Sequence, residues 1–452
     1  MGLTSKMKQY KGNIYLVDDN FENKIIGATL TIDNDNFELE FSDTTYRQSS
    51  YKIIQGEFLD LGYVTLIDCI HSGNTLSIIH LTKYRIQHII TEIKFDDYNS
   101  IVATSLHIKM PSLNEWIRKL TLTGSLIFNG KIEYSKPEKI LFFENNEYSV
   151  QIGFYLQENR NESITITQYC ELEIKSKNDS LNVFELFNVY KKIKIFLGFI
   201  GVFSKQQDEF YLREENLVYE GQDEPITMKF LTKNFDTNNS GILTHIKINF
   251  TDIEGSINTI LNNWLTNEKI QDSIILVMEK YTSLKLTVET YFLNTCFAIE
   301  TFHRKNKFNT VFSVSDFNKI KRGIRSKLET DNEIKLFNDK LQFANEPTFK
   351  DRLISLKSEF ESITFEGLDI EEYIVKIVKT RNYLVHRGSK NNIFNNLEMY
   401  YAAVYLEALT KFCIMETTGF EKELLNKIFR DTGTKINHNY ELSANYTISK
   451  YL

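Results

Sequence analysis

The sequence predicts an α+β protein in which a β-rich N-terminal domain, residues 1–260, precedes an all-α helical bundle, residues 270–452. Two observations carry this prediction. Short segments rich in β-branched and aromatic residues, separated by Asn, Asp, Gly and Ser, fill the first half. Beyond residue 270, long segments without Gly or Pro carry apolar residues at helical spacing. A chain of 452 residues is long enough for two or three domains with separate cores.

The N-terminal half is expected to form a sandwich or barrel-like domain of short strands. The segments with strand composition before residue 180 are GATLTI, FELEFS, YVTLIDCI, LSIIHL, IVATSLHI, SLIFNGKIEYS, YSVQIGFYL and ITITQYCELEIKS. Within one of them, Asn129-Gly130 predicts a two-residue hairpin turn. A helical insertion is predicted at residues 180–203, and strands are predicted to resume at residues 224–232 and 241–250.

The C-terminal half is expected to form a bundle of four or five helices. Residues 273–306 predict one long helix, because this segment contains neither Gly nor Pro. Further helices are predicted within residues 314–341, 349–363, 368–388 and 396–420. The Asn-rich segment GSKNNIFNN between the last two predicts a loop.

The composition indicates a globular protein without a membrane span. Hydrophobic residues make up 42% of the chain and charged residues 25%, and no stretch approaches the roughly 20 apolar residues that cross a bilayer. The N-terminal sequence MGLTSKMKQYKGN lacks the apolar segment of a secretory signal, so a cytoplasmic location is expected. The cysteines are too far apart for metal-ligand spacing and are expected to be reduced core thiols: Cys69, Cys170, Cys296 and Cys413.

Charge is distributed unevenly along the chain. Residues 1–270 contain 27 Lys and Arg against 36 Asp and Glu, a net charge of −9, whereas residues 271–452 contain 26 against 24, a net charge of +2. The overall charge of −7 therefore does not exclude a nucleic-acid partner for the C-terminal half.

Familiar catalytic motifs are absent from the sequence. It contains no GxxxxGK[ST], HExxH or GxSxG pattern and no GxGxxG that opens a helix. Residues 236–247, DTNNSGILTHIK, begin like a calcium-binding EF-hand loop, but Lys247 stands where that loop requires Glu. This segment is interpreted as a polar turn, and neither a metal nor a cofactor is expected.

The segment RNYLVH, residues 381–386, places an arginine on the apolar face of a predicted helix and a histidine in its last turn. At about 100° per residue, these apolar side chains fall within about 60° of Arg381: Ile374, Ile377, Val378, Leu384 and Val385. A guanidinium there needs an anion, a partner subunit or a water-filled cleft, because an unpaired buried charge costs several kcal/mol. Asn382 and His386 nearly share a face, and Gly388 is the predicted C-cap. The alternative is a structural role, in which the side chains contact only terminal carbonyls.

The Arg-Asn-x3-His pattern of Arg381, Asn382 and His386 resembles the motif of the HEPN family of RNases, which lies near the end of a helix in a small α bundle. The upstream segment FAIETFHR and the segment EEYIVKIVKTRNYLVHRG together resemble the ApeA-like branch of that family. In the first half, YKGNIYLVDD, GATLTI, IIQGEF and VTLIDC resemble the β-rich N-terminal domain of ApeA-type anti-phage proteins, with Tyr15 at a position where Trp is expected. The resemblance covers most of the chain.

The resemblance implies a metal-independent endoribonuclease of anti-phage defence that cleaves host RNA, with tRNA as the expected substrate, and so causes abortive infection. HEPN nucleases are generally homodimers whose motif helices meet across a two-fold axis, which would account for an arginine on an apolar helix face. The N-terminal domain is expected to sense a phage-derived trigger or to restrain the nuclease. No membrane contact is expected.

The same resemblance assigns roles to the motif residues. His386 is expected to act as general base or acid when the RNA 2′-hydroxyl attacks the adjacent phosphate. Arg381 is expected to stabilise the charge on the phosphoryl oxygens, and Asn382 to orient His386 or the phosphate. The expected products are a 2′,3′-cyclic phosphate and a 5′-hydroxyl.

Residues around the motif carry weaker predictions. Arg387 and Lys390 are the predicted RNA-binding residues, because they adjoin the motif. Glu300 is expected to be a surface residue, with pairing to Arg381 as the alternative, and His303 is expected to be a surface histidine. A basic run either contacts RNA or forms a solvated helix face: Lys319, Lys321, Arg322, Arg325 and Lys327.

Two other function classes remain open from the sequence. One is a non-catalytic HEPN module that uses its helices for dimerisation or RNA binding, beside a ligand-sensing β domain; the complete motif counts against it. The other is a ligand-binding β domain with a helical dimerisation tail. In that case Arg381→Ala would damage assembly whereas His386→Ala would have no effect.

Overall fold

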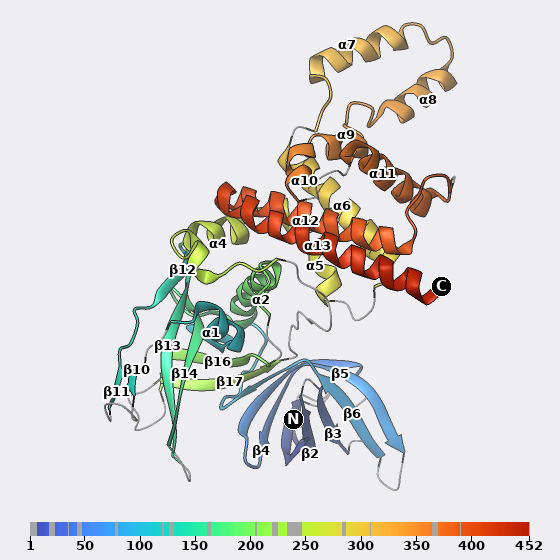
Figure 1. Cartoon of the computed structure of the whole chain (residues 1–452). Coiled ribbons are helices and arrows are strands. Elements are labelled where there is room, and N and C mark those ends of the chain that lie inside the picture. Colours follow the sequence, from blue (N-terminus) through green and yellow to red (C-terminus); the bar gives the residue numbers. More distant parts are fainter. Residues whose placement is uncertain are drawn as a thin grey trace. The chain divides into compact units, whose positions relative to one another are not determined.

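The computed structural model describes residues 7–17, 23–34, 36–42, 48–76, 80–119, 122–125, 131–160, 164–203, 206–218, 225–232, 246–282, 286–307, 309–363, 369–388 and 390–451. The chain divides into two compact units (Figure 1). The β-rich unit comprises Met1–Lys194 and Phe203–Asp236, and the helical unit comprises Ile195–Val202 and Thr237–Leu452. The predicted domain limits, 1–260 and 270–452, stay a prediction.

The β-rich unit contains a closed antiparallel barrel, as the strand pattern predicted. Its strands are β1 (Lys8–Val17), β2 (Asn23–Asp33), β3 (Asn36–Phe41), β4 (Ser50–Phe58), β5 (Gly62–Leu76) and β6 (His80–Ile86). In the described part of the chain they are hydrogen bonded in the order β5-β4-β1-β2-β3-β6, and β6 pairs with β5 to close the ring. Closure leaves no unpaired edge within this set of strands.

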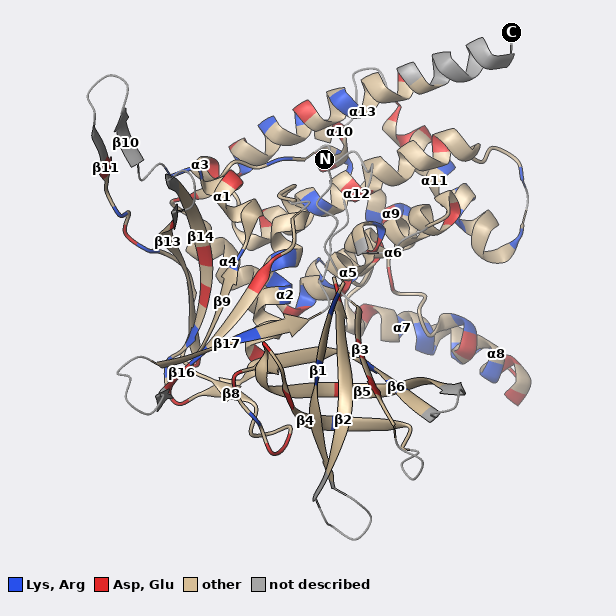
Figure 2. Cartoon of the chain, turned by 90° about the horizontal axis from the view of Figure 1, so that it is seen from below, with Lys and Arg blue, Asp and Glu red and all other residues tan. Residues whose placement is uncertain are grey.

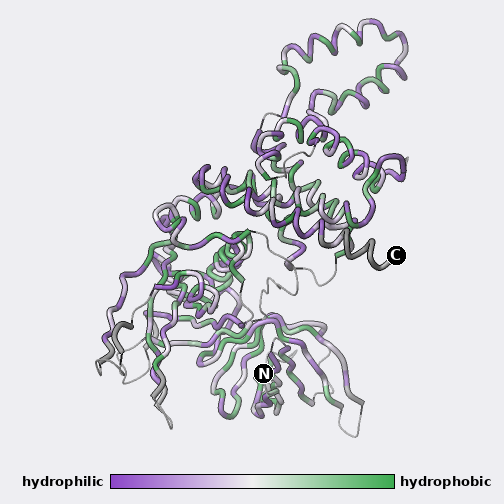
Figure 3. Tube along the Cα trace, in the orientation of Figure 1, coloured by the Kyte–Doolittle hydropathy of each residue, from purple (hydrophilic) through white to green (hydrophobic). Residues whose placement is uncertain are grey.

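Apolar and polar residues alternate along the strands, and the apolar side chains fill the barrel interior. Ile14, Leu30, Leu39 and Leu66 are fully buried, and Figure 3 shows green and purple residues alternating along these strands. Gly12 lets β1 lie close against β4, because a Cβ atom there would lie only 2.1 Å from the carbonyl oxygen of Glu57. The segment YKGN therefore needs glycine at this position.

The sheet continues beyond β5 in the order β7, β17, β16, β9, β14, β13, β12. These strands are β7 (His88–Thr91), β9 (Ser105–Lys109), β12 (Ile140–Glu144), β13 (Tyr148–Arg160), β14 (Ile164–Ser176), β16 (Glu209–Val218) and β17 (Pro225–Thr232). Two short pairs accompany them: β8 (Val102–Ala103) with β15 (Leu181–Asn182), and β10 (Leu122–Ser125) with β11 (Lys131–Tyr134). The predicted turn at Asn129-Gly130 lies outside the described residues.

Two helices accompany these strands, α1 (Pro111–Ile117) and α2 (Val183–Phe199). Helix α2 confirms the predicted helical insertion. Within the β-rich unit its aromatic side chains pack on the sheet, and the ring centroids of Tyr190 and Phe210 are 4.9 Å apart. The Tyr190 hydroxyl and the Lys194 ammonium both donate to Oδ2 of the buried Asp208, at 2.7 and 2.6 Å. This buried carboxylate therefore links α2 to the chain that follows it.

The helical unit consists of α3 (Phe250–Ile253), α4 (Ile257–Thr266), α5 (Glu268–Thr282), α6 (Val288–Asn306), α7 (Val314–Arg325), α8 (Asp331–Leu341), α9 (Phe349–Ile354), α10 (Lys357–Ile363), α11 (Ile370–His386), α12 (Asn396–Thr418) and α13 (Lys422–Tyr451). Helix α12 is buried on all sides along most of its length, so it forms the centre of the bundle. In the described chain no helix is both long and apolar enough to cross a bilayer.

Several element predictions were wrong. Residues 273–306 form two helices, because the Thr287 side chain accepts a hydrogen bond from the Thr290 N–H at 3.2 Å and starts α6. The bundle has more helices than the four or five predicted, and α13 was not predicted. The described end of the predicted strand 241–250 is irregular and leads into α3. Residues 236–245, which carry the partial calcium-loop pattern, lie outside the described residues.

A buried polar cluster joins α5, α6 and α12 in the centre of the bundle. The Glu407 carboxylate accepts from the hydroxyls of Tyr281, at 2.5 Å, and of Tyr291, and it pairs with Lys411 at 2.9 Å and Lys280 at 3.5 Å. These contacts hold the pKa of Glu407 far below its usual range despite burial. All four cysteines are free and buried, as the sequence predicted.

Candidate functional site

Helix α11 carries the RNYLVH motif at its C-terminal end. The Asp369 side chain starts the helix by accepting from the backbone N–H groups of Glu371 and Glu372. The buried residues of the helix lie at helical spacing: Ile370, Ile374, Ile377 and Thr380. The last turn is different, because Asn382, Val385 and His386 are exposed. Part of the predicted apolar face around Arg381 is therefore uncovered in the single chain.

Arg381 is held by an acidic partner and by two aromatic rings. Its Nη2 lies 3.2 Å from Oε2 of Glu300 on α6, and its Nη1 donates to Oδ1 of Asn382 at 3.3 Å. Its Cζ lies 5.7 Å from the ring centroid of Phe297 and 5.5 Å from that of Phe349. Its buried Nε has no hydrogen-bond partner in the described chain. Glu300 therefore pairs with Arg381, which was the alternative and not the favoured interpretation of this residue.

The ion pair continues away from the motif. Glu300 also contacts Arg304, one turn later on α6, at 3.5 Å. Arg304 in turn lies 3.3 Å from Glu346, which pairs with the buried Arg352 at the same distance. Alternating charges therefore connect Arg381 to the segment between α8 and α9.

His303 is buried, so the expectation of a surface histidine was wrong. Arg352 Nη1 lies 3.1 Å from His303 Nδ1, and His303 Nε2 lies 2.8 Å from the Ser355 hydroxyl. A guanidinium can only donate, so Nδ1 is the acceptor and Nε2 carries the hydrogen. Burial, with Arg352 and Lys307 nearby, lowers the pKa of His303 to about 4. His303 therefore anchors Arg352.

His386 and Asn382 line an open groove of about 500 Å³. The other residues that line it are Lys379, Tyr383, Gly388 and Asn391. Arg381 does not line this groove, because it points toward α6 from another side of α11. Within one chain the structure therefore brings Asn382 and His386 together and places Arg381 next to them rather than opposite them. The groove offers an imidazole, an amide and a lysine to a polar ligand.

The helix ends at His386 and its C-cap is Arg387, so the prediction that Gly388 is the C-cap was wrong. Arg387 has φ +54° and ψ +36°, and its N–H donates to the Tyr383 carbonyl at 2.8 Å. A non-glycine residue in the left-handed region is strained, because Cβ crowds the following carbonyl. Arg387 and Lys390, the predicted RNA-binding residues, are both exposed beside the groove, and the Lys390 ammonium lies 5.8 Å from the Tyr383 ring centroid.

One residue that matters for the motif was missed in the sequence. The fully buried Thr380 hydroxyl donates to the Lys376 carbonyl at 2.8 Å and accepts from the Phe394 N–H at 3.0 Å. This pair fixes the loop after His386 to the body of α11. Only the position of threonine on the buried side of the helix, directly before Arg381, could have indicated it.

In the described residues, no group of three or more His, Cys, Asp or Glu is arranged to hold a metal ion. The sequence model described as ApeA N-terminal domain 1 matches residues 9–264, more than half of the chain, and the model described as Apea-like HEPN matches residues 293–424, which include the whole motif and Glu300. No curated protein and no solved structure matches the chain significantly. The chain therefore belongs to the family of ApeA-like HEPN proteins.

Proposed function

We propose that the protein is a metal-independent endoribonuclease that acts in the cytoplasm in anti-phage defence and cleaves host RNA, with tRNA as its substrate. Cleavage of host RNA would stop growth of the infected cell and so limit phage spread. The observation that carries the proposal is the complete motif at the exposed end of α11, where His386 and Asn382 line one groove beside an anchored Arg381.

His386 is the proposed proton-transfer group. An imidazole can act as either general acid or general base near neutral pH. It would take the proton of the 2′-hydroxyl as that oxygen attacks the adjacent phosphorus, or give a proton to the departing 5′-oxygen. The products are then a 2′,3′-cyclic phosphate and a 5′-hydroxyl, so DNA is not a substrate.

Arg381 is the proposed stabiliser of charge on the phosphoryl oxygens. The Glu300 pair and the two aromatic rings restrict its rotation, and a fixed guanidinium stabilises developing charge with little reorganisation. Because Arg381 and His386 point to different sides of α11, a second copy would have to complete the site. The exposed Val385 beside His386 suits such an interface. We therefore propose a homodimer through the HEPN domain, in which the β-rich unit senses a phage-derived trigger.

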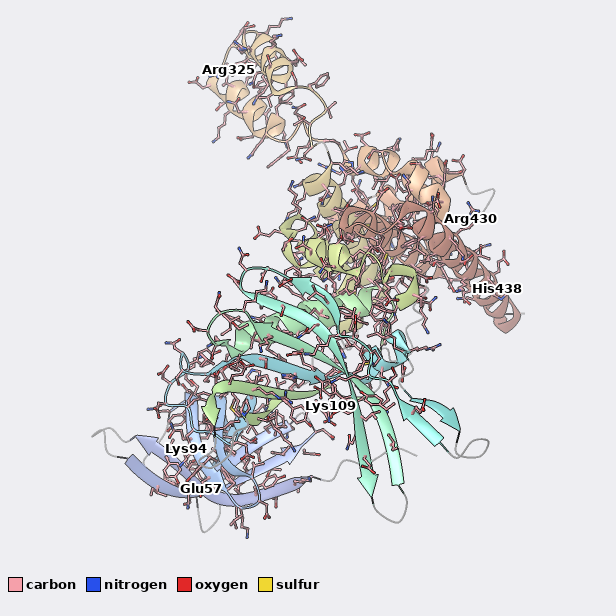
Figure 4. The ribbon with its side chains drawn as sticks, turned by 90° about the vertical axis from the view of Figure 1, so that its left-hand side faces the viewer. Glu57, Lys94, Lys109, Arg325, Arg430 and His438 are labelled. Carbon is pink, nitrogen blue, oxygen red and sulfur yellow. The ribbon has the colours of Figure 1, made fainter. Side chains whose placement is uncertain are left out.

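The test is cleavage of purified tRNA in EDTA by wild type, His386→Ala and His438→Ala. His438 lies exposed on α13 (Figure 4) and controls for the loss of a histidine. We expect wild type and His438→Ala to produce fragments ending in a 2′,3′-cyclic phosphate, and His386→Ala to be at least about 100-fold slower, as general acid–base catalysis contributes about 10²–10⁴. All three proteins should have the same oligomeric mass.

The assay is repeated with phage lysate to supply a trigger. Intact RNA with all three proteins in both conditions would refute the nuclease and favour the non-catalytic RNA-binding or dimerisation module. Cleavage that survives in His386→Ala at the wild-type rate would place the catalytic site elsewhere.

A further inference from the structure

The hairpin of α7 and α8 is the part of the helical unit that packs least against the bundle (Figure 1). Every residue from 309 to 363 is described, and neither helix contains a buried residue. A segment of about thirty residues that contributes nothing to a core needs another reason to hold its shape, because ordering it costs conformational entropy.

The base of this hairpin is fixed on both legs. The Phe312 N–H donates to Asn345 Oδ1 at 2.8 Å, and the Asn345 amide donates back to the Phe312 carbonyl at 3.0 Å. The buried Arg352 binds Asn309 on one leg at 2.6 Å and Glu346 on the other at 3.3 Å. One guanidinium therefore holds both legs.

The same base adjoins the proposed catalytic motif. Phe349 follows the hairpin, and its ring lies 5.5 Å from the Arg381 guanidinium. Glu346 is connected to Arg381 through Arg304 and Glu300. The hairpin thus starts beside the residue proposed to stabilise the phosphate, and its base has a defined position relative to that residue.

Helix α7 carries several basic residues (Figure 2), and three of them gather on one side. Lys321, Arg322 and Arg325 fall within about 100° of one another around the helix axis. In the described chain none of the three lies within 4.0 Å of a carboxylate, whereas Lys319 pairs with Asp316 at 3.2 Å. Cations near the C-terminus of a helix interact favourably with the helix dipole. That effect falls off within the last turn, so it does not account for Lys321.

Apolar side chains line an open groove between α7 and α8. The groove between them, about 460 Å³, is lined by Ile324, Leu328, Leu336, Phe337 and Leu341, with Glu333 and Lys340. Lys321, Arg322 and Arg325 do not line this groove, so their charged groups are left for a ligand.

We propose that the α7–α8 hairpin is an arm that contacts the substrate RNA, and that Lys321, Arg322 and Arg325 bind phosphates outside the cleaved bond. The proposal rests on the proposed action of this domain on RNA. Guanidinium groups match phosphate oxygens with two hydrogen bonds, and unpaired cations give up no protein ion pair when they bind. With its base fixed beside Arg381, the arm would hold RNA whose scissile phosphate lies at the motif.

The test compares two triple variants in a His386→Ala background, so that RNA is bound and not cut. The first is Lys321→Gln with Arg322→Gln and Arg325→Gln. The control removes the same charge from exposed positions on α13: Lys427→Gln with Arg430→Gln and Lys435→Gln. Figure 4 labels Arg325 on the hairpin and Arg430 on α13. The Kd for fluorescent tRNA is measured between 50 and 200 mM KCl, with circular dichroism and oligomeric mass as checks of folding.

We expect the α7 variant to bind at least about tenfold more weakly at 100 mM KCl, and its slope of log K against log salt to fall by about 2, since each single-stranded phosphate contact contributes about 0.7. The α13 variant should match the parent. Any of three results would overturn the proposal that the hairpin is an RNA-binding arm. These are an equal Kd and slope in all three proteins, an equal loss of affinity in both variants, and no RNA binding by the parent. Cleavage is measured separately in proteins that keep His386. If such a protein cleaves tRNA and the α7 substitutions leave its RNA binding unchanged, only the proposed RNA-binding arm is refuted. If RNA binding depends on the α7 residues but no cleavage occurs, only the proposed nuclease is refuted.

Discussion

His303 shows how one buried side chain couples the helical unit to pH. Its hydrogen bonds to Arg352 and Ser355 require the neutral ring, and its pKa is lowered to about 4. The unfolded chain binds the proton near pH 6.5, whereas the folded chain does so near pH 4. The contribution of His303 to the free energy of unfolding is therefore fully present above pH 6.5 and is lost as the pH falls from 6.5 toward 4.

We predict that protonation of His303 alone lowers the free energy of unfolding by about 2 kcal/mol between pH 7 and pH 5. The measurement is urea unfolding followed by fluorescence in a Trp116→Phe background, where Trp264 of the helical unit is the remaining tryptophan. His303→Gln should lose about 2 kcal/mol less than the parent over this pH range, whereas His438→Gln should behave as the parent. The same loss in parent and His303→Gln would contradict the assignment.

At the scale of an element, the conformation of α11 and the loop after it depends on Thr380. Thr380→Val keeps the shape of the side chain but leaves the Phe394 N–H without its acceptor. An unsatisfied buried donor costs about 1–3 kcal/mol, so we predict that Thr380→Val lowers the free energy of unfolding by that amount. We also predict weaker RNA binding, because Arg387 and Lys390 lie on the loop that the substitution releases. Urea unfolding and Kd for tRNA measure the two effects.

Thr434→Val is the matched control. Its hydroxyl also donates to the carbonyl four residues earlier, at 3.1 Å, but it is exposed on α13. Its effect should stay within about 0.5 kcal/mol, as for most surface substitutions. Equal losses in the two variants would mean that the Phe394 contact contributes nothing.

The position of the motif at the end of a helix was predictable from the sequence, whereas the contacts around it were not. Asp369 and the spacing of Ile374 and Ile377 define α11 locally. The ion pair of Arg381 with Glu300, 81 residues earlier, was only the less favoured interpretation of that glutamate. The end of the helix was predicted one residue too late. Glycine was expected at the C-cap because it adopts the left-handed conformation most easily, but here Arg387 adopts that conformation. The buried site of His303 depends on Arg352, about fifty residues later, which no local pattern reports.

At the scale of the whole molecule, the order of a β-rich part before a helical part was predictable from the change of hydrophobic period alone. The assignment of α2 was not. The apolar run IKIFLGFIGVF predicted burial, but periodicity does not say in which core a segment is buried. Phe196 and Phe199 pack on Trp264 at centroid distances of 5.3 and 4.9 Å, so residues 195–202 complete the core of the helical unit.

This assignment predicts which core each phenylalanine of α2 supports. Phe199 and Phe187 are both nearly fully buried, but Phe199 belongs to the helical unit and Phe187 to the β-rich unit. Phe199→Ala should lower the unfolding free energy reported by Trp264, in the Trp116→Phe background, by about 3–5 kcal/mol, because it leaves a cavity in that core. Phe187→Ala removes the same atoms from the other core and should leave the Trp264 transition within about 1 kcal/mol of the parent. If both variants shift that transition equally, residues 195–202 do not distinguish the two cores, and the chain unfolds as one cooperative body.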